Sequence, residues 1–334
     1  MSADRLKRPA PLEATVRAVQ EILAGNSTEA AAGRAGLEPA DLEAAVAVYQ
    51  RAGRHALAQQ AGPQQWRQLY VQFTDWDKAE QTATAHIAPV LAMAEQDRQL
   101  AGWWFIRKHP CWRMRLLPAP GAQLARTLSD TLGGLAADRG IQRWWPGIYE
   151  PETAAFGGDT SMAIAHTLFH ADSSAILTAS HGALGRREVS LLLCATLMRA
   201  AGLEWYEQGD VWHRVTEERP LPSYVPADKV HAMAGNLRLL LVTDTSPTST
   251  MLQSDRALKH AADWVRAFRN AGRDLGITAR DGRLDRGLRE VIAYHVIFHW
   301  NRLGLHAHAQ SILAHAARAA ILHRVDSSRQ RPMP

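Results

Sequence analysis

Three arginines lie close together in a segment whose pattern predicts a β-hairpin. Arg107 stands just before a Lys-His-Pro turn, and Arg113 and Arg115 follow that turn. Alternate side chains of a strand point to opposite faces, so Trp112 and its apolar neighbours would face the core while Arg113 and Arg115 face away. Arginine keeps its proton and presents a planar fork of donors, so this face could bind carboxylates or a developing oxyanion. The alternative is a solvated sheet face with surface ion pairs.

Two carboxylates come shortly before a Gly-Gly turn at the end of a further predicted strand. The sequence Tyr-Glu-Pro-Glu occupies 149–152, and Phe-Gly-Gly follows at 156–158. Loops at strand ends commonly carry function, so Tyr149, Glu150 and Glu152 are candidate binding residues. An ordinary acidic turn is the alternative.

Imidazoles, a carboxylate and hydroxyls gather in one predicted helical stretch, His166 to Ser174. His170, Asp172 and Ser173 are the residue types of a Ser-His-Asp hydrolase. No glycines flank the serine as a nucleophile elbow requires. A capping or buried polar role is therefore favoured over nucleophilic catalysis.

A second helical stretch carries two histidines on the same face as an arginine. His295 and His299 are four residues apart and share their face with Arg302. A zinc protease needs a glutamate directly after the first histidine, where this chain has Val296, so we expect no metal site. A histidine that titrates near neutral pH beside arginines could act as a general acid or base. The alternative is a hydrogen-bonded core histidine.

The elements around these candidates predict an α+β fold. Residues 1–62 are alanine-rich with helical spacing and predict a three-helix unit, whose acidic final helix favours docking or peptide contact over DNA binding. Residues 63–326 form the main domain. Strands and helices are interleaved up to about residue 160, where the hairpin indicates an antiparallel or mixed sheet, and helices follow. We expect residues 327–334 to be disordered.

The composition of the chain limits the kinds of function that it can have. The chain has 334 residues, and 46% of them are hydrophobic. Its net charge is +5, and the basic residues are scattered along the sequence. This charge distribution suits an acidic or peptide substrate at least as well as nucleic acid. Cys111 and Cys194 cannot form a disulfide framework or a metal knuckle. No apolar run reaches the ~18 residues that span a bilayer, and the N-terminus lacks a secretory signal. We expect a cytoplasmic protein.

Taken in order, these motifs resemble one family. The hairpin, the Tyr-Glu-Pro-Glu and Phe-Gly-Gly segments, Asp172-Ser173 and the run His-Trp-Asn-Arg-Leu at 299–303 look like the C-terminal domain of class I lantibiotic dehydratases. That domain also occurs as a separate protein, the thiopeptide-type bacteriocin biosynthesis protein. The resemblance covers about residue 65 to the C-terminus.

The resemblance implies a lyase that eliminates glutamate from a ribosomal precursor peptide. A partner enzyme first esterifies Ser or Thr with glutamate from glutamyl-tRNA. The domain then removes the Cα proton and expels glutamate, which leaves dehydroalanine or dehydrobutyrine. The implied partners are the precursor peptide and the glutamylating enzyme, and full-length relatives suggest a homodimer. We expect neither a metal nor an organic cofactor, and no direct binding of tRNA or DNA.

By the same resemblance, Arg115 stabilises charge or binds glutamate with support from Arg107, and His299 or His295 transfers the proton. The remaining implied substrate contacts are Arg113, Tyr149, Glu150, Glu152, His170, Asp172, Ser173, Asn301 and Arg302. We expect Arg107, Arg115 and His299 to converge on one pocket.

One position departs from the family pattern. The dehydratases generally carry an arginine directly before the aromatic-Gly-Gly turn, and this chain has Ala155 there. Two other functions therefore remain open. One is the reaction of the related pyridine synthases, which join two dehydroalanines in a formal cycloaddition and release the leader peptide. The other is a non-catalytic partner of the dehydratase that binds the leader peptide.

Overall fold

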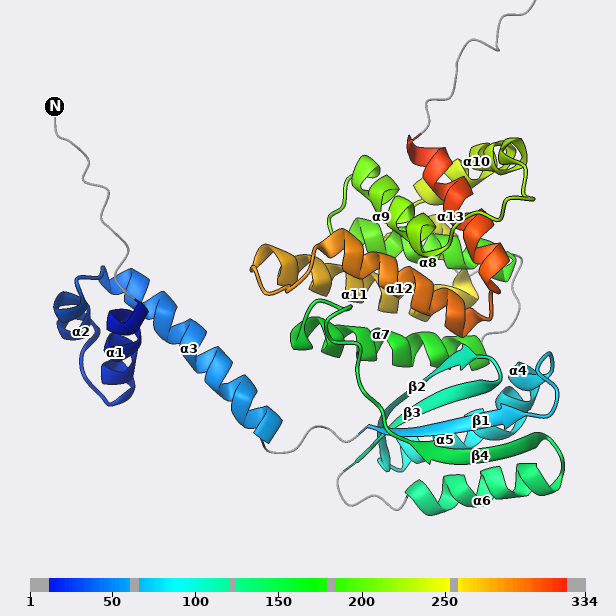
Figure 1. Cartoon of the computed structure of the whole chain (residues 1–334), viewed down its shortest axis with the longest axis horizontal. Coiled ribbons are helices and arrows are strands. Elements are labelled where there is room, and N and C mark those ends of the chain that lie inside the picture. The colour runs from blue at the N-terminus through cyan, green and yellow to red at the C-terminus, as the bar shows by residue number, and fades with distance from the viewer. Residues whose placement is uncertain (1–11, 61–65, 120–123, 179–183, 253–257, 323–334) are drawn as a thin grey trace, which may run out of the picture. The chain divides into compact units, whose positions relative to one another are not determined.

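The computed structural model describes residues 12–60, 66–119, 124–178, 184–252 and 258–322. The chain divides between Gln65 and Trp66 into two compact units (Figure 1). The tail predicted to be disordered, 327–334, lies outside the described residues.

The N-terminal unit consists of three helices, as its sequence predicts. They are α1 (Leu12–Leu23), α2 (Thr28–Ala35) and α3 (Pro39–Gln60). The hydroxyl of Ser27 caps α2 by accepting a hydrogen bond from the Ala30 N–H, and Gly36 ends the helix with a left-handed φ of 66°. A small core closes the unit; it comprises Ala18, Val19, Ala31, Ala32 and Leu42.

The second unit contains a four-stranded sheet of order β2-β3-β1-β4. The strands are β1 (Arg67–Phe73), β2 (Leu100–Lys108), β3 (Cys111–Pro118) and β4 (Ile141–Gly147). All three pairings are antiparallel, and β2 and β3 form the predicted hairpin. The α+β fold class is thereby confirmed. β4 ends at Gly147, so Tyr149 and Glu150 lie just beyond the strand.

One face of the sheet packs on the helices that connect its strands. These are α4 (Ala79–Thr82), the π-helical turn Ala83–Ile87, α5 (Ala88–Gln96) and α6 (Leu124–Ala137) (Figure 1). The buried side chains between them include Val71, Phe105, Trp112, Met114, Ile87, Leu91 and Leu132. Strand alternation puts Arg113 and Arg115 on the opposite face, as predicted.

Helix α7 (Asp159–Thr178) covers the outer edge of β2. The Phe105 N–H donates to Ser173 Oγ at 3.2 Å, and His170 Nδ1 donates to the Trp103 carbonyl oxygen at 2.9 Å. Polar side chains of α7 therefore satisfy backbone groups that an edge strand would otherwise expose.

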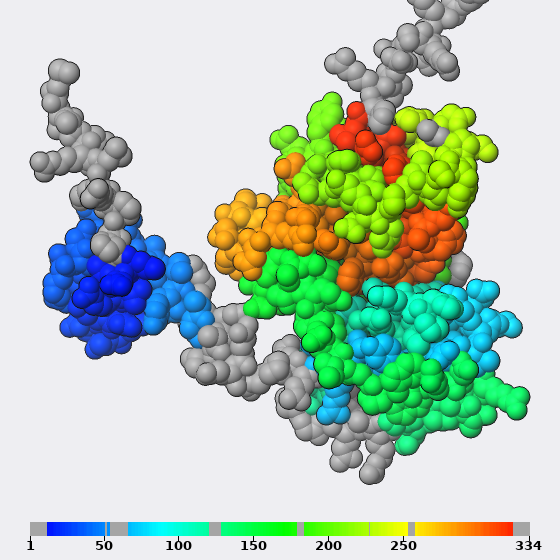
Figure 2. Space-filling view, in the orientation of Figure 1, coloured from blue at the N-terminus to red at the C-terminus, as the bar shows by residue number. Residues whose placement is uncertain are grey.

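The rest of the unit is helical. Its helices are α8 (Arg186–Ala200), α9 (Trp205–Glu218), α10 (Ala227–Val242), α11 (Ala262–Arg280), α12 (Leu288–Leu303) and α13 (Ala307–Leu322), with short 3₁₀ turns at Thr250–Leu252 and Lys259–Ala261. Two glycines let α11 approach α8 closely, because an added Cβ would lie 2.3 Å from the Leu197 oxygen at Gly272 and 2.5 Å from the Ala201 oxygen at Gly276. The space-filling view shows the surface of this helical half lying directly on the sheet region (Figure 2), and α12 contacts β2. Within the described ranges, no helix has the length and apolarity needed to cross a membrane.

Candidate functional site

The hairpin register separates the arginines that the sequence pattern groups together. Arg107 pairs with Trp112, and Trp104 pairs with Arg115. Because paired residues share a face, Arg107 lies on the Trp112 face and Arg115 on the opposite one. The expected convergence of Arg107, Arg115 and His299 on one pocket is therefore wrong. Alternation separates odd from even positions within one strand, but the register across the turn decides which residues of two strands share a face.

Arg107 connects the sheet to the helical half. Its Nε donates to the carbonyl oxygen of Arg302 at 2.7 Å, and its Nη2 forms an ion pair with Glu80. Glu80 also pairs with Arg186 at 2.6 Å. Burial alone would raise the pKa of Glu80, but these two arginines outweigh it and lower the pKa. Arg107 is thus held by protein groups on both sides.

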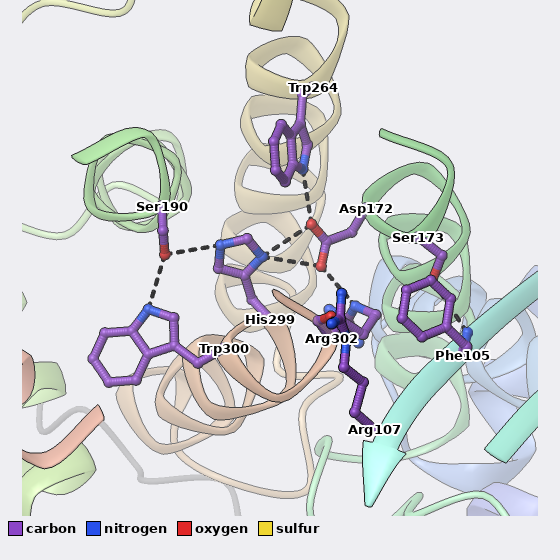
Figure 3. A network of polar contacts seen from close by, with 9 residues as sticks. All are labelled: Phe105, Arg107, Asp172, Ser173, Ser190, Trp264, His299, Trp300 and Arg302. Carbon is purple, nitrogen blue, oxygen red and sulfur yellow. Dashed lines mark hydrogen bonds and ion pairs between the residues drawn. The ribbon is translucent and has the colours of Figure 1, made fainter. Parts of the chain in front are cut away.

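A buried network surrounds Asp172 and joins four helices (Figure 3). The Asp172 carboxylate, on α7, accepts hydrogen bonds from Trp264 Nε1 at 2.8 Å, from His299 Nδ1 at 2.9 Å and from Arg302 Nε at 2.6 Å. Burial would raise the pKa of this carboxyl, and the contacts with His299 and Arg302 lower it instead. The carboxylate therefore stays ionised and satisfied inside the core.

His299 belongs to this network and lies fully inside the protein. Its side chain is 1% exposed, and its Nε2 lies 2.9 Å from Ser190 Oγ, which also accepts a hydrogen bond from Trp300 Nε1. Both ring nitrogens of His299 are thus occupied by protein groups. This geometry suits a residue that fixes α7, α8 and α12 relative to one another.

His295 lies one helical turn earlier, among aromatic rings. The centroid of its ring is 4.9 Å from that of Phe156 and 5.8 Å from that of Phe169. Burial and the positive charge of Arg302 lower the pKa of His295 to about 3. Neither of its nitrogens has a hydrogen-bond partner among the described residues.

Other predicted contacts also serve the packing of the helical half. Ser173 and His170 bond the β2 edge, and His170 Nε2 lies 3.2 Å from Glu95. Asn301 Oδ1 accepts from Gln310 on α13. The guanidinium of Arg302 lies 4.2 Å from the centroid of the Phe169 ring and is fully buried.

A second cluster forms around Arg115 on the other face of the sheet. Its members are Arg115, Tyr149, Glu152, His166, Trp66 and Trp104, and we call them the Arg115 cluster. The guanidinium carbon lies 4.3 Å from the Trp104 ring and 5.2 Å from the Tyr149 ring. The Tyr149 oxygen lies 2.8 Å from His166 Nε2, and the ring of Trp66 lies 4.7 Å from that of His166.

The Arg115 cluster has a polar interior that its own residues leave incompletely hydrogen-bonded. Arg115 is 3% exposed, and within the described ranges its side chain forms one hydrogen bond, from Nη1 to the Arg113 carbonyl oxygen at 3.2 Å. Arg115 Nε, Trp104 Nε1 and Glu152 Oε2 are buried without a partner among the described residues. Buried polar atoms are normally satisfied, so a polar ligand would gain hydrogen bonds here.

Burial shifts the pKa values of the cluster strongly. It lowers the pKa of Arg115 to about 10, an effect that the charge of Glu152 partly offsets. It also lowers the pKa of His166 to about 4, and the charge of Arg115 adds to this. Burial and Glu152 raise the pKa of Tyr149. At neutral pH the cluster therefore holds a guanidinium cation beside a neutral imidazole and a protonated phenol, which can bind a carboxylate and accept a proton.

The sequence pattern selects part of this cluster. Arg115, Tyr149 and Glu152 meet in it, whereas Glu150 is exposed and Arg113 lies on the neighbouring part of the face. The pattern places His166 in its helical stretch without marking it as a site residue, and it gives no signal for Trp66. His166 and His170 lie one helical turn apart on α7, but only the packing of α7 shows that His166 faces Arg115.

The structure offers two further observations on binding. A groove of about 850 Å³ runs between α7 and α11, lined by residues such as Thr167, Trp264 and Asn270, and it does not include Arg115 or His166. In the described part of the chain, no group of three or more His, Cys, Asp or Glu residues could hold a metal ion.

Comparison with known proteins adds the family and the fold. The family model for the lantibiotic biosynthesis dehydratase C-terminal region matches residues 66–321. No curated protein sequence matches the chain. The solved structure of the tRNA-dependent lantibiotic dehydratase MibB from Microbispora sp. 107891 is similar, with a TM-score of 0.59 at 18% identity, and the match covers 77% of this chain but only 28% of MibB.

Two smaller proteins have similar structures along nearly their whole length. TsrL aligns with a TM-score of 0.56 at 15% identity, covering 76% of this chain and 93% of TsrL. The pyridine synthase TbtD from thiomuracin biosynthesis aligns with a TM-score of 0.56 at 14% identity, covering 77% of this chain and 97% of TbtD. At these identities the likeness establishes the shared fold.

Proposed function

This chain belongs to the lantibiotic biosynthesis dehydratase C-terminal family, and we propose on that premise that it is a lyase of ribosomal-peptide modification that eliminates glutamate from glutamylated Ser or Thr. The precursor peptide and the enzyme that glutamylates it are then its partners. The observation that carries the proposal is the Arg115 cluster, where a buried and incompletely bonded guanidinium meets a neutral imidazole.

Elimination requires one proton acceptor and one group that receives the departing carboxylate. The Cα–H and Cβ–O bonds break, the Cα=Cβ bond forms, and glutamate leaves with the electron pair of the Cβ–O bond. Charge develops on the peptide carbonyl and on the leaving carboxylate, where fixed cationic donors are most effective. Arg115 meets this need with its free Nε and its rigid position over the Trp104 ring.

In this proposal His166 accepts the Cα proton. The contact of His166 Nε2 with the Tyr149 oxygen fixes the orientation of the ring. In the proposed tautomer, Nε2–H donates to that oxygen and Nδ1 presents the free lone pair. His166 thus replaces His299 and His295, the candidates for proton transfer suggested by the family resemblance. His299 has both nitrogens occupied, and His295 is enclosed by aromatic rings. Tyr149 and Glu152 belong to the same cluster and contact the substrate in this proposal.

The test is mass spectrometry of a glutamylated Ser/Thr precursor peptide incubated with the protein. We expect loss of glutamate together with a dehydroamino acid, and loss of this conversion in Arg115→Lys and His166→Ala. Arg67→Lys is the matched control, because Arg67 lies on β1 but on the opposite sheet face. An unchanged ester under conditions where the peptide binds would exclude elimination.

Ala155 favours a second candidate, a cycloaddition like that of the pyridine synthases. The chain lacks the arginine that dehydratases carry there, and it matches TbtD over 97% of that protein. The same assay with a peptide that contains two dehydroalanines distinguishes the two, because cyclisation would release the leader peptide as a separate mass. Binding of either peptide without conversion would indicate a non-catalytic leader-binding partner.

A further inference from the structure

The sheet face that carries Arg115 continues over β1 and β4 as a row of aromatic and cationic side chains. The rings of Tyr70 and Trp145 stack, with centroids 5.2 Å apart and an interplanar angle of 13°. The guanidinium carbon of Arg143 lies 4.7 Å from the Trp145 ring, and that of Arg113 lies 5.6 Å from the Tyr70 ring. The register pairs Tyr70 with Arg113 on one side and with Trp145 on the other. We call these four residues the cationic–aromatic row.

The row is open to solvent and carries positive charge without a matching carboxylate. Arg143 is exposed, and Tyr70, Trp145 and Arg113 are partly exposed. The Nε of Arg143 donates to Gln72 Oε1 at 3.0 Å, a neutral group. Among the residues that the structure describes, no acidic side chain forms an ion pair with Arg113 or Arg143. Arginines stacked on aromatic rings are well placed to bind carboxylates from another molecule.

The two edges of the sheet are poor sites for adding a peptide strand. The β2 edge is covered by α7, whose Ser173 already accepts from the Phe105 N–H. The β4 edge contains Pro146, which has no N–H to donate. The face that carries the row is therefore better suited than the edges for contact with a peptide.

We propose that the cationic–aromatic row binds an acidic, extended segment of the precursor peptide, outside the Ser or Thr that reacts. The identity of the peptide rests on the proposed function. The row leads directly toward the Arg115 cluster, because Gln68, two residues before Tyr70 on the same strand face, pairs with Arg115. A segment bound on the row would thus place the following part of the peptide beside Arg115.

The geometry favours a carboxylate ligand over a nucleic acid. Single-stranded nucleic acids bind such sheets by stacking bases on free aromatic faces. Here Tyr70 and Trp145 stack on each other, and each ring also has a guanidinium carbon over it. The ring edges and the guanidinium donors remain available, and these suit carboxylates and apolar side chains.

The experiment uses the full chain and a fluorescein-labelled peptide in which glutamate alternates with serine and leucine. The control peptide has glutamine at each glutamate position, so it has the same length but no negative charge from its side chains. We expect anisotropy titrations to give a dissociation constant about tenfold lower for the glutamate peptide, corresponding to one or two guanidinium–carboxylate contacts. Arg143→Gln should remove most of this difference, and Arg67→Gln, which takes the same charge from the other face of β1, should preserve it.

Equal affinities for the two peptides would overturn the proposal, as would equal losses in Arg143→Gln and Arg67→Gln. Stronger competition by a single-stranded RNA of matched length would also overturn it, in favour of nucleic acid. Binding is measured without any glutamyl ester, so an inactive protein that shows the charge-dependent binding would contradict the proposed elimination alone. An active protein without charge-dependent binding would contradict this inference alone.

Discussion

His299 Nδ1 lies 2.9 Å from Oδ1 of Asp172, although 127 positions separate the two residues in the chain. Together with Arg302 and Trp264, this contact encloses a carboxylate that is 0% exposed. The Asp172 network therefore holds α7, α11 and α12 together. The Arg115 cluster, which contains His166 of the same α7, depends on this arrangement.

Asp172→Asn should strongly destabilise the protein, because it leaves the buried Arg302 guanidinium without a counter-charge. Removing one partner of a buried ion pair costs about 3–5 kcal/mol. The free energy of unfolding, measured by urea denaturation, is the readout. Asp274→Asn is the control, since its pair with Arg273 is about half exposed and such pairs contribute ~0–1 kcal/mol. Similar losses of unfolding free energy in the two variants would contradict a structural role for the network.

Gly304→Ala should destabilise the protein more than Gly202→Ala. Both glycines have a left-handed φ, +82° and +84°, so both substitutions carry a strain of about 1–3 kcal/mol. At Gly304 the new Cβ would also lie 2.8 Å from the Arg107 guanidinium, whereas at Gly202 the nearest atom is 3.7 Å away. The Arg107 guanidinium is held by Glu80 and the Arg302 carbonyl, so it cannot move without losing a contact. Equal shifts in the urea midpoint of the two variants would show that the Arg107 side chain can move aside without a loss of stability.

Stability should fall as the pH drops below about 6.5, partly through His166. Its pKa is about 4 in the folded protein and 6.5 for the free side chain, so between these values the unfolded chain binds the extra proton. Protonation therefore favours unfolding across this window, and stability is fully retained above it. His166→Gln should flatten the dependence of the unfolding free energy on pH between 4 and 6.5. His86→Gln, which removes an exposed imidazole, is the control, and an equal change in both variants would contradict the assignment.

The rate of elimination should show little pH dependence on the acid side of neutrality. If His166 accepts the proton, kcat/KM stays level from neutral pH down toward its pKa of about 4, because the imidazole is already neutral there. A fall centred near 6.5 would instead indicate a solvent-exposed histidine as the base. The measurement is the initial rate with a glutamylated peptide at low concentration, over the range in which the protein stays folded.

Arg115→Lys should reduce the elimination rate about 10²–10³-fold, the range seen when one donor to a developing charge is lost. Lysine keeps the charge but loses the planar fork and the stacking on the Trp104 ring. Arg67→Lys on the opposite face should leave the rate unchanged. A rate for Arg115→Lys within a factor of two of that of the unsubstituted protein would show that Arg115 has no role in the reaction.

The sequence by itself determined the local elements and the kind of fold. Alternation predicted the hairpin and placed Arg113 and Arg115 opposite Trp112 and Met114, because side-chain direction in a strand depends only on neighbouring residues. Helical spacing likewise predicted the N-terminal helices and the helical half. Four short motifs in order were enough to indicate the family.

Only the tertiary structure decided which of these residues meet. The register of the hairpin put Arg107 on the face opposite Arg115, and packing enclosed His299 in hydrogen bonds with Asp172 and Ser190. The packing of α7 brought His166 to Tyr149 and Arg115, a meeting that no local spacing encodes. Whether a histidine is a buried structural residue or a catalytic base depends on the residues around it, and contacts between distant segments determine which residues those are.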